Sequence, residues 1–183
     1  MDSTEIDHKA ELVNRCKKGD KTAQYRLYLE YADAMFSICK SLVSNPTDVE
    51  EVLQDAFVKA YTRLNKLKDN RKFAGWLKTI TVNECLNFLK KKKIVFDELP
   101  ENYTDVDETD DTAIQIDRES LRKAIDDLPE GSRIIFNLYL IEDYKHKEIA
   151  RMLGISESTS KSQYARAKQL LKEKILKKNE RQV

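Results

Sequence analysis

The stretch HKEIARMLGIS at residues 146–156, followed by ESTSKS at residues 157–162, decides how the last third of this chain folds. Two helices can cross closely where small residues meet, and Ala150 and the turn glycine Gly154 are such residues. Ser156 is placed to cap the second helix by accepting a hydrogen bond from a backbone amide. The apolar residues spaced to hold the two helices together are Ile149, Leu153 and Ile155. The pattern predicts a helix-turn-helix whose second helix can enter the DNA major groove, although an ordinary helical hairpin also fits.

Charge is distributed unevenly along the 183 residues, although the net charge is only +1. Residues 59–93 hold eleven Lys or Arg and two acids, and residues 145–181 hold eleven Lys or Arg and four acids. Between these blocks, residues 94–117 hold nine Asp or Glu and no basic residue. The two basic blocks indicate two separate contacts with a polyanion. Solvated helix faces would explain each block alone, but they explain the segregation less well.

Several other classes of protein are disfavoured by the composition. Cys16, Cys39 and Cys85 are isolated and odd in number, and no two have metal-ligand spacing, so we expect buried reduced thiols. The chain lacks a phosphate-binding glycine loop, and His8 and His146 lack the partners of a catalytic triad, so we expect no enzyme, no metal and no cofactor. No signal pattern opens the chain and no run approaches 18 apolar residues, which predicts a cytoplasmic protein without membrane insertion.

Helical periodicity dominates the first half of the chain, and strand signals are weak. A first helix is expected over about residues 4–18, ending at Gly19. A second helix carries an apolar stripe made of Tyr25, Tyr28, Leu29, Ala32, Met35, Phe36, Cys39, Leu42 and Val43. Thr47 and Glu50 form the pattern of a capping box that opens a third helix. That helix has the clearest stripe, which consists of Val49, Val52, Leu53, Ala56, Phe57, Ala60, Tyr61 and Leu64. A fourth helix is expected over about residues 73–92.

The acidic segment over residues 96–112 contains Pro100 and has little periodicity, which is typical of a linker. Helices resume near Ile114, pause at residues 128–131 and continue to Ile141. The helix-turn-helix then closes the chain, and we expect its last helix to reach about residue 177.

The predicted fold class is therefore all-α. Two small helical domains, residues 1–93 and 113–183, are joined by an acidic flexible linker over residues 94–112. A linker of about 20 residues spans up to about 70 Å when extended, which is about two helical turns of DNA. Both domains could therefore contact the same duplex.

The chain also resembles the sigma-70 family of RNA polymerase sigma factors. Residues 48–57 (DVEEVLQDAF) resemble region 2.2, and residues 73–83 (FAGWLKTITVN) resemble regions 2.3 to 2.4. Residues 128–168, which include EIARMLGIS and RAK, are similar to region 4. Only these two domains are present, which is the layout of the extracytoplasmic-function (ECF) group. The resemblance implies an alternative sigma factor that binds core RNA polymerase and directs promoter recognition and transcription initiation.

In this family region 2.2 docks on a basic coiled coil of the largest polymerase subunits. The residues that would carry this docking here are Asp48, Glu50, Glu51, Gln54 and Asp55. Charge complementarity of this kind speeds encounter and fixes register. A helix dipole also favours acids in a first turn, but that alternative does not explain Asp55, which lies two turns in.

The resemblance assigns the −10 element to the first domain. A polar loop can follow phosphates and bind an unstacked base, and the candidates here are Lys66, Lys68, Asn70, Arg71 and Lys72. Asn70 is the expected base reader of this loop. On the helix that follows, the candidates are Thr79, Asn83 and Asn87, with Asn83 best matched to the family.

The −35 element is assigned to the second domain. The first turns of a recognition helix meet base edges, and here they contain Ser158, Thr159, Lys161, Ser162 and Gln163. Lys161 can donate to guanine and Gln163 can pair with adenine. Phosphate contacts are expected from Arg166 and Lys168. The chain departs from the family at Ser160, which replaces a usual apolar residue, and at Lys145, which replaces a serine cap; we expect Asp143 to take over as the cap.

Two alternatives remain open. A helix-turn-helix regulator acting without polymerase would leave the region 2 resemblance unexplained. A sigma mimic that binds an anti-sigma factor should have lost the basic residues of its DNA faces, but both basic blocks remain. An anti-sigma partner is itself an expectation from the family. The acidic linker is either a solvated tether or, as in the family, a segment that mimics nucleic acid charge.

Overall fold

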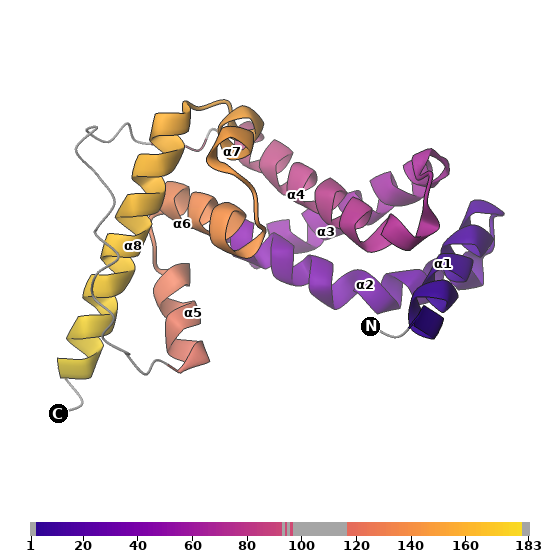
Figure 1. Cartoon of the computed structure of the whole chain (residues 1–183), viewed down its shortest axis with the longest axis horizontal. Helices are drawn as coiled ribbons and strands as arrows, with labels where there is room; N and C mark the ends of the chain where they lie inside the picture. The colour runs from indigo at the N-terminus through magenta and orange to yellow at the C-terminus, as the bar shows by residue number, and fades with distance from the viewer. Residues whose placement is uncertain (1–2, 93, 95, 97–116, 181–183) are drawn as a thin grey trace. The chain divides into compact units, whose positions relative to one another are not determined.

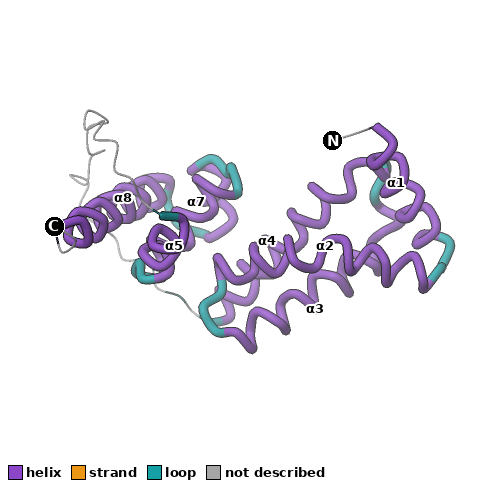
Figure 2. The backbone as a smooth tube through the Cα atoms, turned by 90° about the horizontal axis from the view of Figure 1, so that it is seen from below, coloured by secondary structure: helices purple, strands orange, loops and turns teal. Residues whose placement is uncertain are grey.

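The computed structural model describes residues 3–92, 94, 96 and 117–180 (Figure 1). Contacts divide the chain into two compact units, residues 1–91 and 92–183. All regular structure in the described ranges is helical, in agreement with the predicted all-α class (Figure 2). The predicted linker lies outside the described residues except for Ile94 and Phe96. None of the described helices is long and apolar enough to span a lipid bilayer.

The first unit contains four α-helices, close to the predicted ranges: α1 (Ser3–Lys17), α2 (Lys21–Leu42), α3 (Pro46–Arg63) and α4 (Phe73–Lys91). Gly19 turns the chain between α1 and α2 with a φ of 86°, a left-handed conformation that glycine adopts without strain. Asp20 then caps α2, because its carboxylate accepts the Ala23 backbone N–H at 3.0 Å.

The prediction that a capping box at Thr47 and Glu50 opens α3 was wrong. The helix begins at Pro46, and Asn45 is its cap, with Oδ1 accepting the backbone N–H of Thr47 at 2.9 Å. Proline suits the first helical position because its missing N–H would have no partner there.

The core of the first unit is built on the α3 stripe, of which all members except the half-buried Tyr61 are buried. Phe57 packs edge-on against Tyr28 of α2, with ring centroids 4.8 Å apart. The α2 stripe is only partly internal, since Tyr25, Leu29 and Phe36 are exposed.

The three cysteines of the first unit are buried free thiols, as predicted. A hydrogen bond with Cys39 and burial together raise the pKa of Cys85 far above its usual range. This thiol therefore stays protonated and behaves as a small apolar side chain.

The second unit contains α5 (Arg118–Asp126), α6 (Glu130–Phe136), a π-helical turn (Asn137–Ile141), α7 (His146–Leu153) and α8 (Glu157–Glu180). Its core joins α6 to α8 around Leu128, Phe136, Ala167 and Leu171. The predicted restart near Ile114 lies outside the described residues, and α5 itself is capped by Asp117.

The helix-turn-helix is formed by α7 and α8, as the opening stretch predicted. Gly154 ends α7 with a φ of 73°, and Ser156 Oγ accepts the backbone N–H of Thr159 at 2.9 Å, which caps α8. The expected cap at Asp143 was wrong, because Glu148 instead accepts the backbone N–H of Lys145 at 3.0 Å. A carboxylate at this third helical position reaches back to the residue that precedes the helix.

Candidate polymerase and promoter surfaces

An acidic surface lies on the outward side of α3. Glu50, Glu51, Gln54 and Asp55 are exposed, and Asp48 is half-buried. The helical period explains the arrangement, because the apolar stripe of α3 faces the core and leaves the polar positions outside. We name Asp48, Glu50, Glu51, Gln54 and Asp55 the α3 acidic face.

The sequence reasoning missed exposed apolar residues on α3 and on α2. Val58 is 61% exposed and lies one turn beyond Gln54 on α3. Tyr25 and Leu29 are 63% and 56% exposed on α2, the helix that packs against α3. The signal in the sequence was a stripe of nine apolar residues over residues 25–43, but the stripe alone did not show which of them the core would cover. Exposed apolar side chains that gather into a patch are typical of a surface that binds another protein.

The segment between α3 and α4 forms two short 3₁₀ turns, Leu64–Lys66 and Asn70–Lys72, separated by a bend. Leu67 is buried in this bend. The four predicted phosphate contacts of this segment are all exposed: Lys66, Lys68, Arg71 and Lys72. We name residues 64–72 the basic loop.

Asn70 is placed differently from its predicted role as a base reader. Its Oδ1 accepts a hydrogen bond from Lys17 Nζ at 2.6 Å, and its Nδ2 donates to the Ala10 carbonyl at 3.4 Å. Both ends of the amide are therefore engaged with α1. Because α1 holds the amide in this position, we leave Asn70 out of the base-reading residues proposed below.

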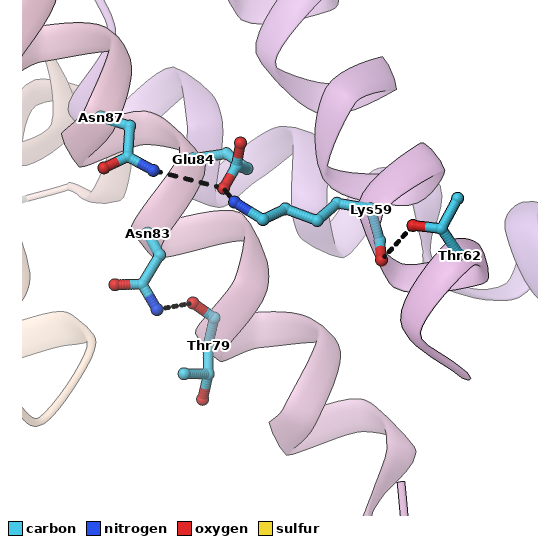
Figure 3. Close-up of polar contacts among 6 residues, drawn as sticks. All are labelled: Lys59, Thr62, Thr79, Asn83, Glu84 and Asn87. Carbon is cyan, nitrogen blue, oxygen red and sulfur yellow. Dashed lines mark hydrogen bonds and ion pairs between the residues drawn. The ribbon is translucent and has the colours of Figure 1, made fainter. Parts of the chain in front are cut away.

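Figure 3 shows the three candidates on α4, which are exposed and follow one another at one-turn spacing. Asn83 Nδ2 donates to the Thr79 carbonyl at 2.8 Å, and Asn87 Nδ2 donates to Glu84 Oε1 at 3.4 Å. Glu84 also forms an ion pair with Lys59 of α3. The arrangement orients Asn83 and Asn87 on one face of α4, where their amide oxygens can accept hydrogen bonds from bases.

The first turn of the recognition helix α8 presents three of the predicted −35 contacts. Ser158 and Lys161 are exposed, and Thr159 is half-buried. Lys161 forms an ion pair with Glu157 at 2.8 Å. This contact lowers the pKa of Glu157, mainly through the hydrogen bond from Lys161, and raises the pKa of Lys161. Lys161 therefore stays charged and can move from a neighbouring carboxylate to a DNA acceptor.

Ser162 and Gln163, by contrast, are buried, with 7% and 2% exposure. Gln163 Oε1 accepts a hydrogen bond from Ser132 Oγ of α6 at 2.6 Å, and Ser162 Oγ donates to the Thr159 carbonyl at 3.1 Å. Their predicted contact with base edges is incompatible with this placement. The helical period could have indicated this, because Gln163 lies four residues before the buried Ala167 and shares its face.

Ser160 is completely buried, and the structure explains this departure from the family. Its hydroxyl lies 2.9 Å from His146 Nδ1 of α7, so that a polar contact replaces apolar packing between the two helices. The His146 ring also stacks on Tyr139, with centroids 4.2 Å apart and planes 11° apart. The remaining predicted phosphate contacts, Arg166 and Lys168, are both half-buried. Lys168 Nζ lies over the Tyr164 ring, 5.3 Å from the ring centroid.

Comparison with known proteins gives matches over both units. Sigma-70 region 2 matches residues 27–94, and sigma-70 region 4 matches residues 118–171. The ECF RNA polymerase sigma factor SigW of Bacillus subtilis (strain 168) is 24% identical over 182 residues, which cover 89% of this chain and 94% of SigW. The ECF RNA polymerase sigma-E factor of Escherichia coli (strain K12) is 27% identical over 177 residues, which cover 90% and 92% of the two chains.

A solved structure has the same fold. The sigma factor RpoE from Bartonella quintana, in complex with the anti-sigma factor NepR, is 21% identical with a TM-score of 0.51. The match covers 84% of this chain and 96% of that chain.

Two helical units that match regions 2 and 4 in this order define a member of the sigma-70 family, and this chain belongs to it. Within the family it belongs to the ECF group. It is an alternative sigma factor, which directs transcription initiation by RNA polymerase, and such proteins are transcription regulators rather than enzymes.

Proposed function

We propose that the chain binds core RNA polymerase through the α3 acidic face and contacts promoter DNA with both units. The −10 element is contacted by the basic loop and α4, through Lys66, Lys68, Arg71, Lys72, Thr79, Asn83 and Asn87. The −35 element is contacted by α8, through Ser158, Thr159, Lys161, Arg166 and Lys168. The observation that carries this assignment is the separation of exposed charge in the first unit, with carboxylates on α3 and cations on the basic loop.

The opposite charges favour two different ligands. DNA phosphates repel the α3 acidic face and attract the basic loop, so the same unit can face DNA on one side and a basic protein surface on another. Val58, Tyr25 and Leu29 are the apolar side chains that such a protein would bury.

We further propose that the protein works in the cytoplasm and that an anti-sigma factor regulates it. A regulator that covers the α3 acidic face would compete with polymerase for the same residues. Such competition requires no chemistry, only a higher affinity or concentration than that of the polymerase.

The test is in vitro transcription with core polymerase from the source organism, to which the purified protein is added. The wild-type protein should produce specific start sites on genomic promoter fragments. Reversing charge in the double variant Glu51→Lys with Asp55→Lys should abolish core binding and output, because the basic partner surface is then repelled. The matched control is Glu119→Lys with Asp126→Lys, which makes the same charge change at exposed positions of α5.

Wild-type core affinity in the α3 double variant would contradict the docking assignment. Promoter binding by the protein alone, with no effect of core polymerase, would instead favour a helix-turn-helix regulator acting without polymerase.

A further inference from the structure

The N-terminal helix α1 is tied to the basic loop by the ammonium group of one lysine. Lys17 Nζ donates to the backbone carbonyl of Leu67 at 2.7 Å and to Asn70 Oδ1 at 2.6 Å. Asn70 Nδ2 in turn donates to the Ala10 carbonyl at 3.4 Å. These partners are separated by 50 to 60 residues in the sequence, so the contacts are tertiary rather than local.

The contacts fix the basic loop at two points. Leu67 lies in the bend between the two 3₁₀ turns, and its side chain is buried beneath it. Asn70 begins the second turn, which Asp69 caps by accepting the backbone N–H of Arg71 at 3.0 Å. A donor that carries a full charge and is partly buried makes stronger hydrogen bonds than a neutral one. We name Lys17, Leu67 and Asn70 the α1 clasp.

The exposed cations of the loop are next to the clasped residues in the sequence. Lys66 and Lys68 flank Leu67, and Arg71 and Lys72 follow Asn70. Holding the Leu67 carbonyl and the Asn70 side chain therefore restricts the directions in which the four cations leave the loop. A loop held in this way loses less conformational entropy when it binds a ligand.

We propose that Lys17 is a positioning residue for recognition of the melted −10 strand. Lys17 holds the basic loop in its binding conformation by tying it to α1, and it does not contact DNA. Asn70 accepts a hydrogen bond from Lys17 and does not read a base. This inference rests on the proposed function of the loop, and it adds a residue of α1 that lies outside the segments assigned to DNA.

The variant that tests the clasp is Lys17→Met, which keeps most of the length of the unbranched side chain but removes its donors. The matched control is Lys18→Met, which removes the same charge from the exposed residue that directly follows α1. Lys17→Arg keeps a charged donor, and Asn70→Ala removes the amide that accepts from Lys17. Each variant is assembled with core polymerase, and holoenzymes with wild-type core affinity are compared.

The probe is a pool of single-stranded DNA oligonucleotides with randomised positions, whose bound fraction is sequenced. Affinity for the selected sequence is measured by fluorescence anisotropy. Amide hydrogen exchange of residues 65–72 is measured on the free protein, where DNA plays no part.

We expect Lys17→Met to weaken binding roughly tenfold, to flatten the base preferences and to speed exchange in the basic loop. Asn70→Ala should do the same, and the double variant should be no worse than either single variant, because both break one unit. Lys17→Arg should retain part of the wild-type base preference, because it keeps a charged donor. Lys18→Met should leave the preferences and the loop exchange unchanged.

Equal behaviour of Lys17→Met and Lys18→Met would overturn the positioning role. The role would also be overturned if Asn70→Ala lost its preference at one base while Lys17→Met lost none, since Asn70 would then read that base directly. If the wild-type holoenzyme selects no sequence, the proposed function of the loop fails, and the positioning role fails with it.

Discussion

Two residues of the recognition helix show that position on a helix outweighs chemical character. Gln163 and Ser162 have side chains suited to reading bases, and residue type alone suggested that role. In the structure both are turned into the second unit, where Ser132 satisfies the Gln163 amide oxygen. Ser158 and Lys161 lie on the outer face, and only such positions are open to a groove.

The first prediction follows from this burial. Gln163→Ala should destabilise the protein by about 2 kcal/mol, because it opens a cavity and leaves the buried Ser132 hydroxyl without its acceptor. Urea denaturation followed by circular dichroism measures the effect. Lys161→Ala, at an exposed position of the same helix, is the control and should change stability by less than about 0.5 kcal/mol. A stable Gln163→Ala protein with altered promoter choice would instead restore Gln163 as a base reader.

How far a single residue can be predicted from sequence depends on its tertiary partners. Ser160 was noted as a departure from the family, but nothing in the sequence identified His146, fourteen residues away, as its partner. The engagement of Asn70 by Lys17 was equally hidden, since fifty-three residues separate them. Local pattern records which face of an element a residue occupies; it does not record what approaches that face.

At the scale of elements, the sequence predicted most of what the structure contains. The four helices of the first unit and the α7–α8 pair follow from helical periodicity and from Gly19, Gly154 and Ser156, which mark where helices end or begin. The start of α3 was misplaced because Asn45 and Pro46 compete with Thr47 as a helix signal, and proline fixes the earlier position. The exposed side of α2 was missed because a broad stripe does not reveal which of its edges is covered.

The corner between α1 and α2 gives a prediction on pH. The Asp20 carboxylate accepts the Ala23 backbone N–H and two hydrogen bonds from Arg15, at 2.9 and 2.7 Å. The backbone bond from Ala23, and after it the bond from Arg15, lower the pKa of Asp20 below its ordinary 3.8. A lowered folded pKa means stability that is present above the unfolded value and is lost as pH falls through the folded value.

Asp20→Asn should therefore lower the thermal midpoint at neutral pH, and the difference from wild type should shrink as the pH falls through the folded pKa of Asp20. Calorimetric scans at neutral pH and at about pH 3 measure the difference in thermal midpoint at each pH. The lower pH lies below the ordinary pKa of carboxyl groups. Asp33→Asn removes the same charge from an exposed position of α2 and serves as control. A difference from wild type that persists undiminished at the lower pH would show that the charge of Asp20 contributes nothing.

At the scale of the whole molecule, the two proposed contacts fall on different units. The α3 acidic face belongs to residues 1–91 and the recognition helix to residues 92–183. Contacts within each unit hold its surface in place, so damage to one surface should leave the other intact.

Lys161→Ala with Arg166→Ala should accordingly keep wild-type affinity for core polymerase and reduce promoter-dependent transcription. Loss of the Arg166 phosphate contact should lower the slope of log affinity against log salt by roughly one unit. Holoenzyme binding to a promoter duplex, measured over a series of salt concentrations, gives this slope. Lys123→Ala with Lys177→Ala, at exposed positions on α5 and near the end of α8, removes the same charge and should leave the slope near the wild-type value. Loss of core affinity in the Lys161 and Arg166 variant would show that the two contacts are not separable.

The ion pair between Lys59 and Glu84 has a mechanical consequence (Figure 3). Lys59 comes from the helix that offers carboxylates outward, and Glu84 comes from the helix that carries Asn83 and Asn87. These two helices also pack against each other, so the ion pair is one of several contacts that fix the angle between them. In the function proposed above, a partner bound at the α3 acidic face would therefore also influence how the amides of α4 are presented to a DNA strand.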